Sequence, residues 1–148
     1  HSTPNIYNKF SQLQCVKQRM DCLKDITIKR SALLEYTVQE LLCGLIENNL
    51  CQQRLVLGIQ HQASHRLKTY KQATIAIQQD AKSQVRHLIG WSLLHHVYLH
   101  PELGISQEYF ANIANINERS ARRYKHLVFH ILLQDIIQLE INLVSTVS

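Results

Sequence analysis

The stretch GISQEYFANIANINERSARRYK, from Gly104 to Lys125, decides how this chain is expected to fold. It predicts two short helices joined by a tight turn. Ser106 is placed to cap a first helix from about Gln107 to Ala114, because a serine side chain accepts a hydrogen bond from the first helical turn. Asn115 stands where the chain must turn, and asparagine tolerates a positive φ better than other residues with side chains. The second helix is expected to begin at Glu118.

The small and apolar positions predict how these two helices pack. Phe110, Ile113 and Ala114 share one face of the first helix, and Ala111 is small where the second helix would cross it. Asn117 is a suitable cap for the second helix, whose Ala121 and Tyr124 face inward. The outward face of that helix carries Glu118, Arg119, Ser120, Arg122, Arg123 and Lys125.

This pattern resembles the helix-turn-helix of bacterial DNA-binding proteins. The preceding segment, Leu88 to Gly104, is similar to the apolar helix and linker before the motif in region 4 of sigma factors and in response-regulator domains. The resemblance therefore covers about residues 88–130. Asn115 replaces the usual turn glycine, and Ala121 is smaller than the branched residue usual at its position. The resemblance implies a sequence-specific protein for double-stranded DNA, typically a transcriptional regulator, with the second helix in the major groove.

The expected DNA contacts follow from the chemistry of that second helix. Arg119 and Arg122 are the candidates for base edges, because a guanidinium can bond O6 and N7 of guanine together. Glu118 and Ser120 could add to this readout. The full set of expected DNA-binding residues is Ser106, Gln107, Asn117, Glu118, Arg119, Ser120, Arg122, Arg123, Lys125 and His126. Those outside the base-reading group are expected to meet phosphates or to hold the first helix on the DNA backbone.

Two alternatives remain open at this point. Small-residue crossings also occur in ordinary helical bundles, so the two helices could be purely structural. The chain could instead be a helical adaptor that binds other proteins without binding DNA. Its protein-binding surface would then be the apolar continuation of the second helix, which contains Leu127, Val128, Ile131, Leu132 and Ile136.

The whole chain predicts an all-α protein. Its 148 residues are 45% hydrophobic, which is enough to build a core. We expect a helical N-terminal portion, residues 1–80, that supports the helix-turn-helix portion, residues 81–148. Apolar periodicity predicts helices over 9–25, 32–47, 50–63, 67–81 and 81–99, with a stop at Asn48-Asn49. The helices over 50–63 and 67–81 could also form one long helix, with Gly58 as a weak point. Residues 139–143 alternate between apolar and polar, which allows either a short strand or more helix.

Charge and hydropathy predict the partners. The net charge of +5 favours a polyanion, and the cations concentrate after Glu118 and in a second group, Arg66, Lys68, Lys71, Lys82 and Arg86. No uninterrupted apolar run is long enough to cross a bilayer, so we expect a cytoplasmic protein with no membrane partner. The apolar residues after Lys125 must be covered, either by the N-terminal helices or in a homodimer. Contacts with other regulatory proteins are also allowed.

No catalytic, metal or cofactor site is expected. With four glycines in the chain, no phosphate-binding loop is present, and the acidic residues are scattered. The cysteines are expected to be reduced thiols, and a zinc site of Cys43, Cys51, His61 and His65 is disfavoured by its spacing. The histidine pairs His61/His65, His96/His100 and His126/His130 stand four apart. Such pairs could bind metal or sense pH, but surface positions, or helix ends where the ring meets carbonyls, are expected for them.

Overall fold

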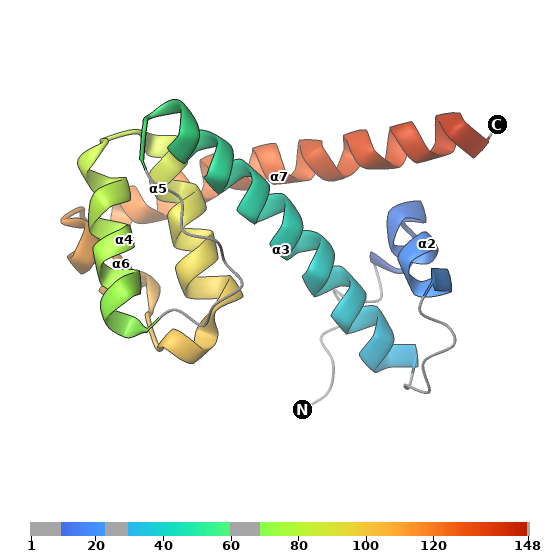
Figure 1. Cartoon of the computed structure of the whole chain (residues 1–148), viewed down its shortest axis with the longest axis horizontal. Coiled ribbons are helices and arrows are strands. Elements are labelled where there is room, and N and C mark those ends of the chain that lie inside the picture. Colours follow the sequence, from blue (N-terminus) through green and yellow to red (C-terminus); the bar gives the residue numbers. More distant parts are fainter. Residues whose placement is uncertain (1–9, 23–29, 60–68, 148) are drawn as a thin grey trace. The chain divides into compact units, whose positions relative to one another are not determined.

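In the computed structural model, residues 10–22, 30–59 and 69–147 are described, and they contain helices and no strand. The expected all-α class is confirmed. The chain divides into two compact units (Figure 1). The terminal unit comprises residues 1–44 and 133–148, and the central unit comprises residues 45–132. This division differs from the expected boundary near residue 80, because the helix before that boundary packs within the central unit.

The terminal unit contains α2 (Gln14–Cys22), the first part of α3 (Arg30–Val56) and the end of α7 (Glu118–Val147). Both carboxylate oxygens of Glu140 on α7 accept from the amide of Gln14, at 2.7 and 2.9 Å. A carboxylate at this position satisfies an unpaired amide at the start of α2 and opposes the positive end of its dipole. The buried apolar side chains are Cys15, Val16, Met20, Leu33, Leu34, Val38, Leu41 and Ile136.

The other helices of the described residues lie in the central unit and surround one core. α4 (Tyr70–Lys82) packs against α5 (Arg86–Leu93) and α6 (Gln107–Ala114). After α5 the chain continues as a π-helix, η1 (Leu94–Leu99), and a 3₁₀ turn, η2 (Pro101–Leu103). Fully buried side chains fill the space between these elements and the adjoining parts of α3 and α7: Leu50, Ile77, Leu88, Trp91, Leu93, Leu94, Phe110 and Val128. Trp91, on α5, is the largest of these side chains and is 1% exposed.

A buried ion pair joins α3 to α4 in the central unit. Arg54 donates to both carboxylate oxygens of Asp80, from Nε at 2.9 Å and from Nη2 at 2.7 Å. The side chains are 3% and 1% exposed. A charge so far from water is tolerated only when its partner satisfies its hydrogen bonds, so this fork-like geometry ties the two helices together.

Gly90 brings α5 unusually close to α7. A Cβ added at Gly90 would lie 2.5 Å from the carbonyl oxygen of Tyr124 and 2.8 Å from Cγ1 of Val128. These distances leave no room for a methyl group. The glycine therefore sets how closely the second helix of the motif lies against the helix that precedes the motif.

Several expected boundaries were wrong. α3 runs without interruption through Asn48 and Asn49. The side-chain amide of Asn49 (Nδ2) donates to the backbone carbonyl of Leu45 at 2.8 Å, so Asn49 does not end the helix. The break comes at Gly58, with a φ of 71°. The helix expected over 81–99 is divided, because Gln84 has a φ of 58° between α4 and α5. Residues 139–143 are helical, since α7 continues to Val147.

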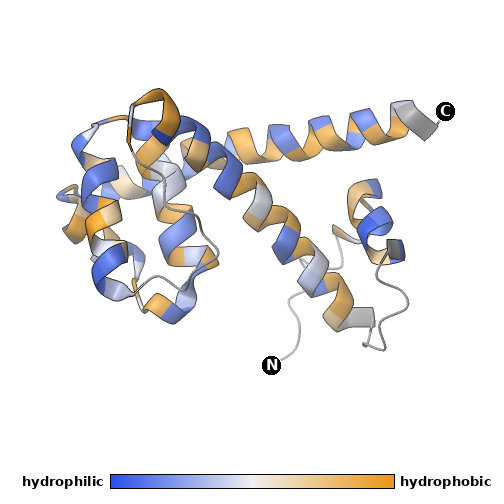
Figure 2. Cartoon of the chain, in the orientation of Figure 1, coloured by the Kyte–Doolittle hydropathy of each residue, from blue (hydrophilic) through white to orange (hydrophobic). Residues whose placement is uncertain are grey.

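α7 also changes the expectation about membranes. Its stretch Glu118–Ser145 is long and apolar enough to cross a bilayer by length and composition alone. Polar residues interrupt every apolar run in this stretch, but a continuous helix joins the runs, and Figure 2 shows both kinds of residue interleaved along α7. Core helices of soluble proteins pass the same test, and the structure is compatible with a soluble protein. In the terminal unit, Leu133, Ile137, Ile141 and Val144 are exposed.

Candidate nucleic-acid interface

The turn between α6 and α7 has the conformation expected from the sequence. Asn115 lies in the left-handed region, with φ 57° and ψ 43°. The amide of Ile116 donates to the carbonyl of Ala111 at 3.0 Å, and the amide of Asn115 donates to that of Asn112 at 3.2 Å. Together these bonds form a Schellman motif, which satisfies the last carbonyls of α6 and turns the chain sharply.

Both helices of the motif are capped by the expected side chains. Ser106 Oγ accepts from the amide of Tyr109 at 3.0 Å, and Asn117 Oδ1 accepts from the amide of Ser120 at 2.7 Å. These bonds fix where α6 and α7 begin. The side-chain oxygens of Ser106 and Asn117 are therefore occupied by capping, and any contact they make with a ligand must use their remaining atoms or their backbone.

Small and apolar residues hold the two helices together. Phe110, Ala111 and Ala114 of α6 are buried, as is Ala121 of α7. The two alanines at the crossing let the helix backbones approach, as the sequence predicts. Ile113 and Tyr124, which were expected to face inward, are only half-buried, and Ile116 in the turn is half-buried as well.

The start of α7 presents a row of cations. Arg119, Arg122 and Arg123 are exposed, as are Glu118 and His126, whereas Ser120 is half-buried. Among the described residues, none of the three guanidinium groups forms an ion pair. Side chains three and four apart lie on the same face of a helix, so Arg119, Arg122 and His126 share one face and Arg123 flanks it. This arrangement gives α7 a positive, solvent-facing surface within its first three turns.

Lys125 differs from these arginines because its amine has partners within the protein. Nζ donates to Oε1 of Gln107 at 2.9 Å and to the hydroxyl of Tyr98 at 3.3 Å. The Tyr98 hydroxyl in turn donates to Gln107 at 3.3 Å. This group joins η1, α6 and α7, so Lys125 and Gln107 help to orient the motif. Lys125 also adds a positive charge to it. Tyr98 was not among the predicted site residues; its side chain is half exposed and its hydroxyl takes part in two of these bonds.

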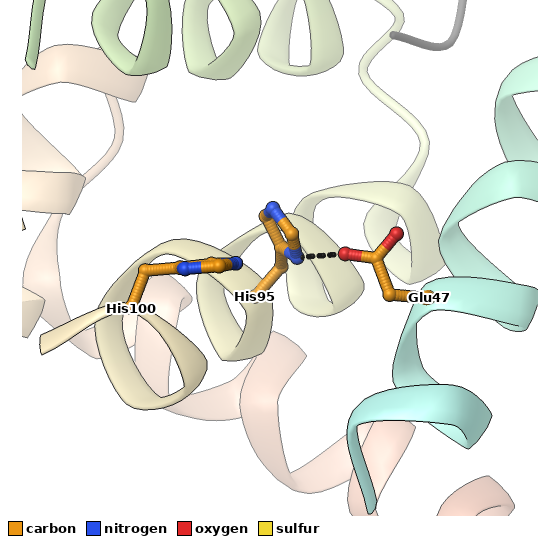
Figure 3. A group of neighbouring side chains, drawn as sticks. All are labelled: Glu47, His95 and His100. Atoms are coloured by element: carbon orange, nitrogen blue, oxygen red, sulfur yellow. Dashed lines mark ion pairs between the residues drawn. The ribbon is translucent and has the colours of Figure 1, made fainter. Parts of the chain in front are cut away.

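A second polar group in the central unit lies away from any predicted site: Glu47 of α3, His95 of η1 and His100 (Figure 3). Nδ1 of His95 lies 2.6 Å from Oε1 of Glu47, and the rings of His95 and His100 have centroids 4.6 Å apart. Nδ1 of His100 lies 2.8 Å from Oε1 of Glu102. Desolvation acts to raise the pKa of Glu102, but its backbone hydrogen bond and His100 lower that pKa below its ordinary value.

His95, which the spacing of four does not select, stands beside His100. His95 and His96 are both buried, so a surface position for His96 was wrong. Nδ1 of His96 bonds the carbonyl oxygen of Ser92 at 2.8 Å. Of the zinc set weighed from the sequence, Cys43 and Cys51 are half-buried thiols on α3, while His61 and His65 lie outside the described residues.

No protein-family model, curated protein or solved structure matches this chain.

Proposed function

We propose that this chain is a sequence-specific binder of double-stranded DNA, acting as a transcriptional regulator or as the DNA-binding part of a larger protein. The observation that carries the proposal is the exposed arginine row of α7, which begins directly after the capped Schellman turn. A helix of this kind fits the major groove, while the helix before the turn crosses the phosphate backbone. The proposal assigns the chain no catalytic role.

The contacts divide by chemistry. Arg119 and Arg122 share the face that would enter the groove, and each can bond a guanine in two places. Arg123 and His126 lie beside this face and are assigned to phosphates. Lys125 contributes positive charge while its amine holds Gln107 in place. Ser106 is assigned a phosphate contact through its backbone at the start of α6, since helix N-termini attract anions.

A homodimer is the proposed functional form. The exposed apolar side chains of α7 in the terminal unit, Leu133, Ile137, Ile141 and Val144, are spaced four, four and three apart and so form one stripe. A second copy of this chain would cover that stripe and bring a second reading helix to a paired half-site. Such pairing is the usual source of high affinity in helix-turn-helix proteins because linked sites bind together.

The test is a fluorescence-anisotropy titration of a labelled DNA duplex that the parent protein has selected from a random-sequence pool. If the motif neutralises four phosphates, affinity falls roughly a hundredfold between about 50 and 200 mM salt. Arg122→Ala should weaken binding about tenfold, since losing one bidentate contact costs about 1–3 kcal/mol. Lys17→Ala is the matched control, because it removes an exposed cation from the terminal unit, and it should bind as the parent does.

The competing function is a helical adaptor that uses the same apolar stripe of α7 to bind another protein. Its supporting observation is the exposure of that stripe. A folded protein that binds no duplex even at low salt would favour the adaptor. Equal losses of affinity in Arg122→Ala and Lys17→Ala would instead contradict binding through the motif, since binding would then follow net charge alone.

A further inference from the structure

We propose that Glu47, His95 and His100 form a binding site for a divalent transition-metal ion, with Zn²⁺ as the representative ion. This site is independent of the proposed DNA binding. Each residue offers one ligand atom, and these atoms all lie within 4.8 Å of one another. Two imidazole nitrogens and one carboxylate oxygen are a set that zinc prefers, whereas magnesium and calcium favour oxygen ligands alone.

The π-helix brings the two histidines together. In an α-helix, residues five apart differ by about 140° around the axis, so they point to different sides. The wider turn of η1 places His95 and the adjoining His100 on the same side, with ring centroids 4.6 Å apart. π-helical turns occur frequently at functional sites. In the proposed site, the π-helical turn of η1 is therefore what brings the second histidine to the ligand set.

The orientation of His100 supports the assignment. Its Nδ1 is engaged by the carboxylate of Glu102 at 2.8 Å, which leaves Nε2 as the coordinating nitrogen. A carboxylate on the far nitrogen is the usual outer partner of a metal-binding histidine, because it fixes the ring and increases its basicity. Figure 3 shows the His95 ring between His100 and Glu47. His95 comes from η1, His100 directly follows η1, and Glu47 comes from α3, so the three donors converge from separate positions.

Burial also suits a bound ion. The side chain of His95 is 1% exposed and that of Glu47 is 15% exposed, while that of His100 is 25% exposed. The group therefore has a rigid inner end and an outer end through which an ion can enter. Tetrahedral zinc places its ligand atoms about 3.3 Å apart. The 2.6 Å contact between Glu47 and His95 would open by about 0.7 Å, and the widest separation, which lies within 4.8 Å, would close by up to about 1.5 Å.

Three protein ligands leave one position of a tetrahedral ion for water or another small ligand. The ion would join α3 to η1 across forty-seven intervening residues. Binding would therefore stabilise the central unit, whose α5 and η1 lie beside the start of α7.

The experiment is calorimetric titration of the metal-depleted full chain with Zn²⁺. We expect one ion per chain. His100→Ala and Glu47→Gln should abolish stoichiometric binding, and Glu102→Gln should weaken it about tenfold through loss of the outer partner. His130→Ala removes an exposed histidine elsewhere on α7 and should leave binding unchanged. Less than a tenth of an equivalent bound to the parent, or parent-like binding by His100→Ala, would overturn the proposal.

A spectrum of the Co²⁺-loaded parent keeps the test valid if a variant fails to fold. Ligand-field bands of tetrahedral cobalt without a thiolate charge-transfer band are expected, because the proposed ligands are nitrogen and oxygen. A strong thiolate band would place the metal on cysteines and contradict the assignment. Octahedral bands alone would show weak surface binding and would contradict it as well.

Discussion

Replacing Gly90 with alanine should strongly destabilise the central unit, although the same change stabilises most helices. In an exposed helix, alanine is favoured over glycine by about 0.8–1.0 kcal/mol. At Gly90 the new Cβ would lie 2.5 Å from a backbone oxygen of α7 and 2.8 Å from Val128. Relieving these overlaps requires the helices to separate by about 1 Å, since carbon contacts are optimal near 3.5–4.0 Å.

The clash outweighs the gain in helix propensity. Overpacking a core typically costs about 1–3 kcal/mol, and a clash with backbone falls at or above the upper end because no side chain can rotate away. We expect a net loss of about 2–3 kcal/mol. Gly44 is the matched control, because a Cβ there meets nothing within 4 Å. Gly44→Ala should gain up to about 1 kcal/mol.

The assay is urea denaturation. Trp91 is the only tryptophan, lies on α5 and is 1% exposed, so its fluorescence reports on the central unit. For a slope of roughly 1–3 kcal/mol per molar urea, the midpoint of Gly90→Ala should fall by about 0.7–3 M. The urea denaturation of Gly44→Ala is followed by circular dichroism. A midpoint for Gly90→Ala at or above that of the parent would refute the close approach of α5 and α7.

Three further predictions concern other parts of the chain. Asp80→Ala should cost about 3–5 kcal/mol in urea denaturation, because it removes the carboxylate that compensates the buried Arg54 charge; a loss below about 1 kcal/mol would contradict a buried pair. Asn115→Gly should raise stability by up to about 1 kcal/mol, and Asn115→Val should lower it by about 1–2 kcal/mol, because the turn needs a left-handed residue; equal midpoints would argue against that conformation. Burial, followed by the nearby Glu140 charge, raises the pKa of Cys15 above its ordinary value of 9.0. Stability from the neutral thiol is therefore complete below that value and is lost as pH rises beyond it; circular dichroism melts should show a steeper decline for the parent than for Cys15→Ala, and parallel pH profiles would count against a buried thiol.

The motif was predictable because its determinants are local. Ser106, Asn115 and Asn117 act within three residues of themselves, through caps and a left-handed turn. The small residues Ala111 and Ala121 indicate that the two helices cross closely, and this inference needs no information about the rest of the chain. The helix bounds 107–114 and the start at Glu118 were therefore predicted correctly.

Features that depend on distant contacts were not predictable in the same way. Asn49 continues α3 instead of ending it, because its side chain bonds within the helix and its neighbour Leu50 is buried. The Arg54–Asp80 pair joins residues 26 apart, which no helical spacing indicates. The group of Glu47, His95 and His100 depends on a π-helix, and a search for histidines four apart selects His96 in place of His95.

The most direct test of the central claim is a map of amide chemical shifts in the ¹⁵N-labelled protein as a DNA duplex is added. Binding by the motif predicts that the largest changes fall on residues 106–107 and 117–126, at the starts of α6 and α7. Changes confined to the other cationic positions, such as Lys71, Lys82 and Arg86, would contradict the assigned surface. No changes at low salt with excess duplex would contradict DNA binding itself.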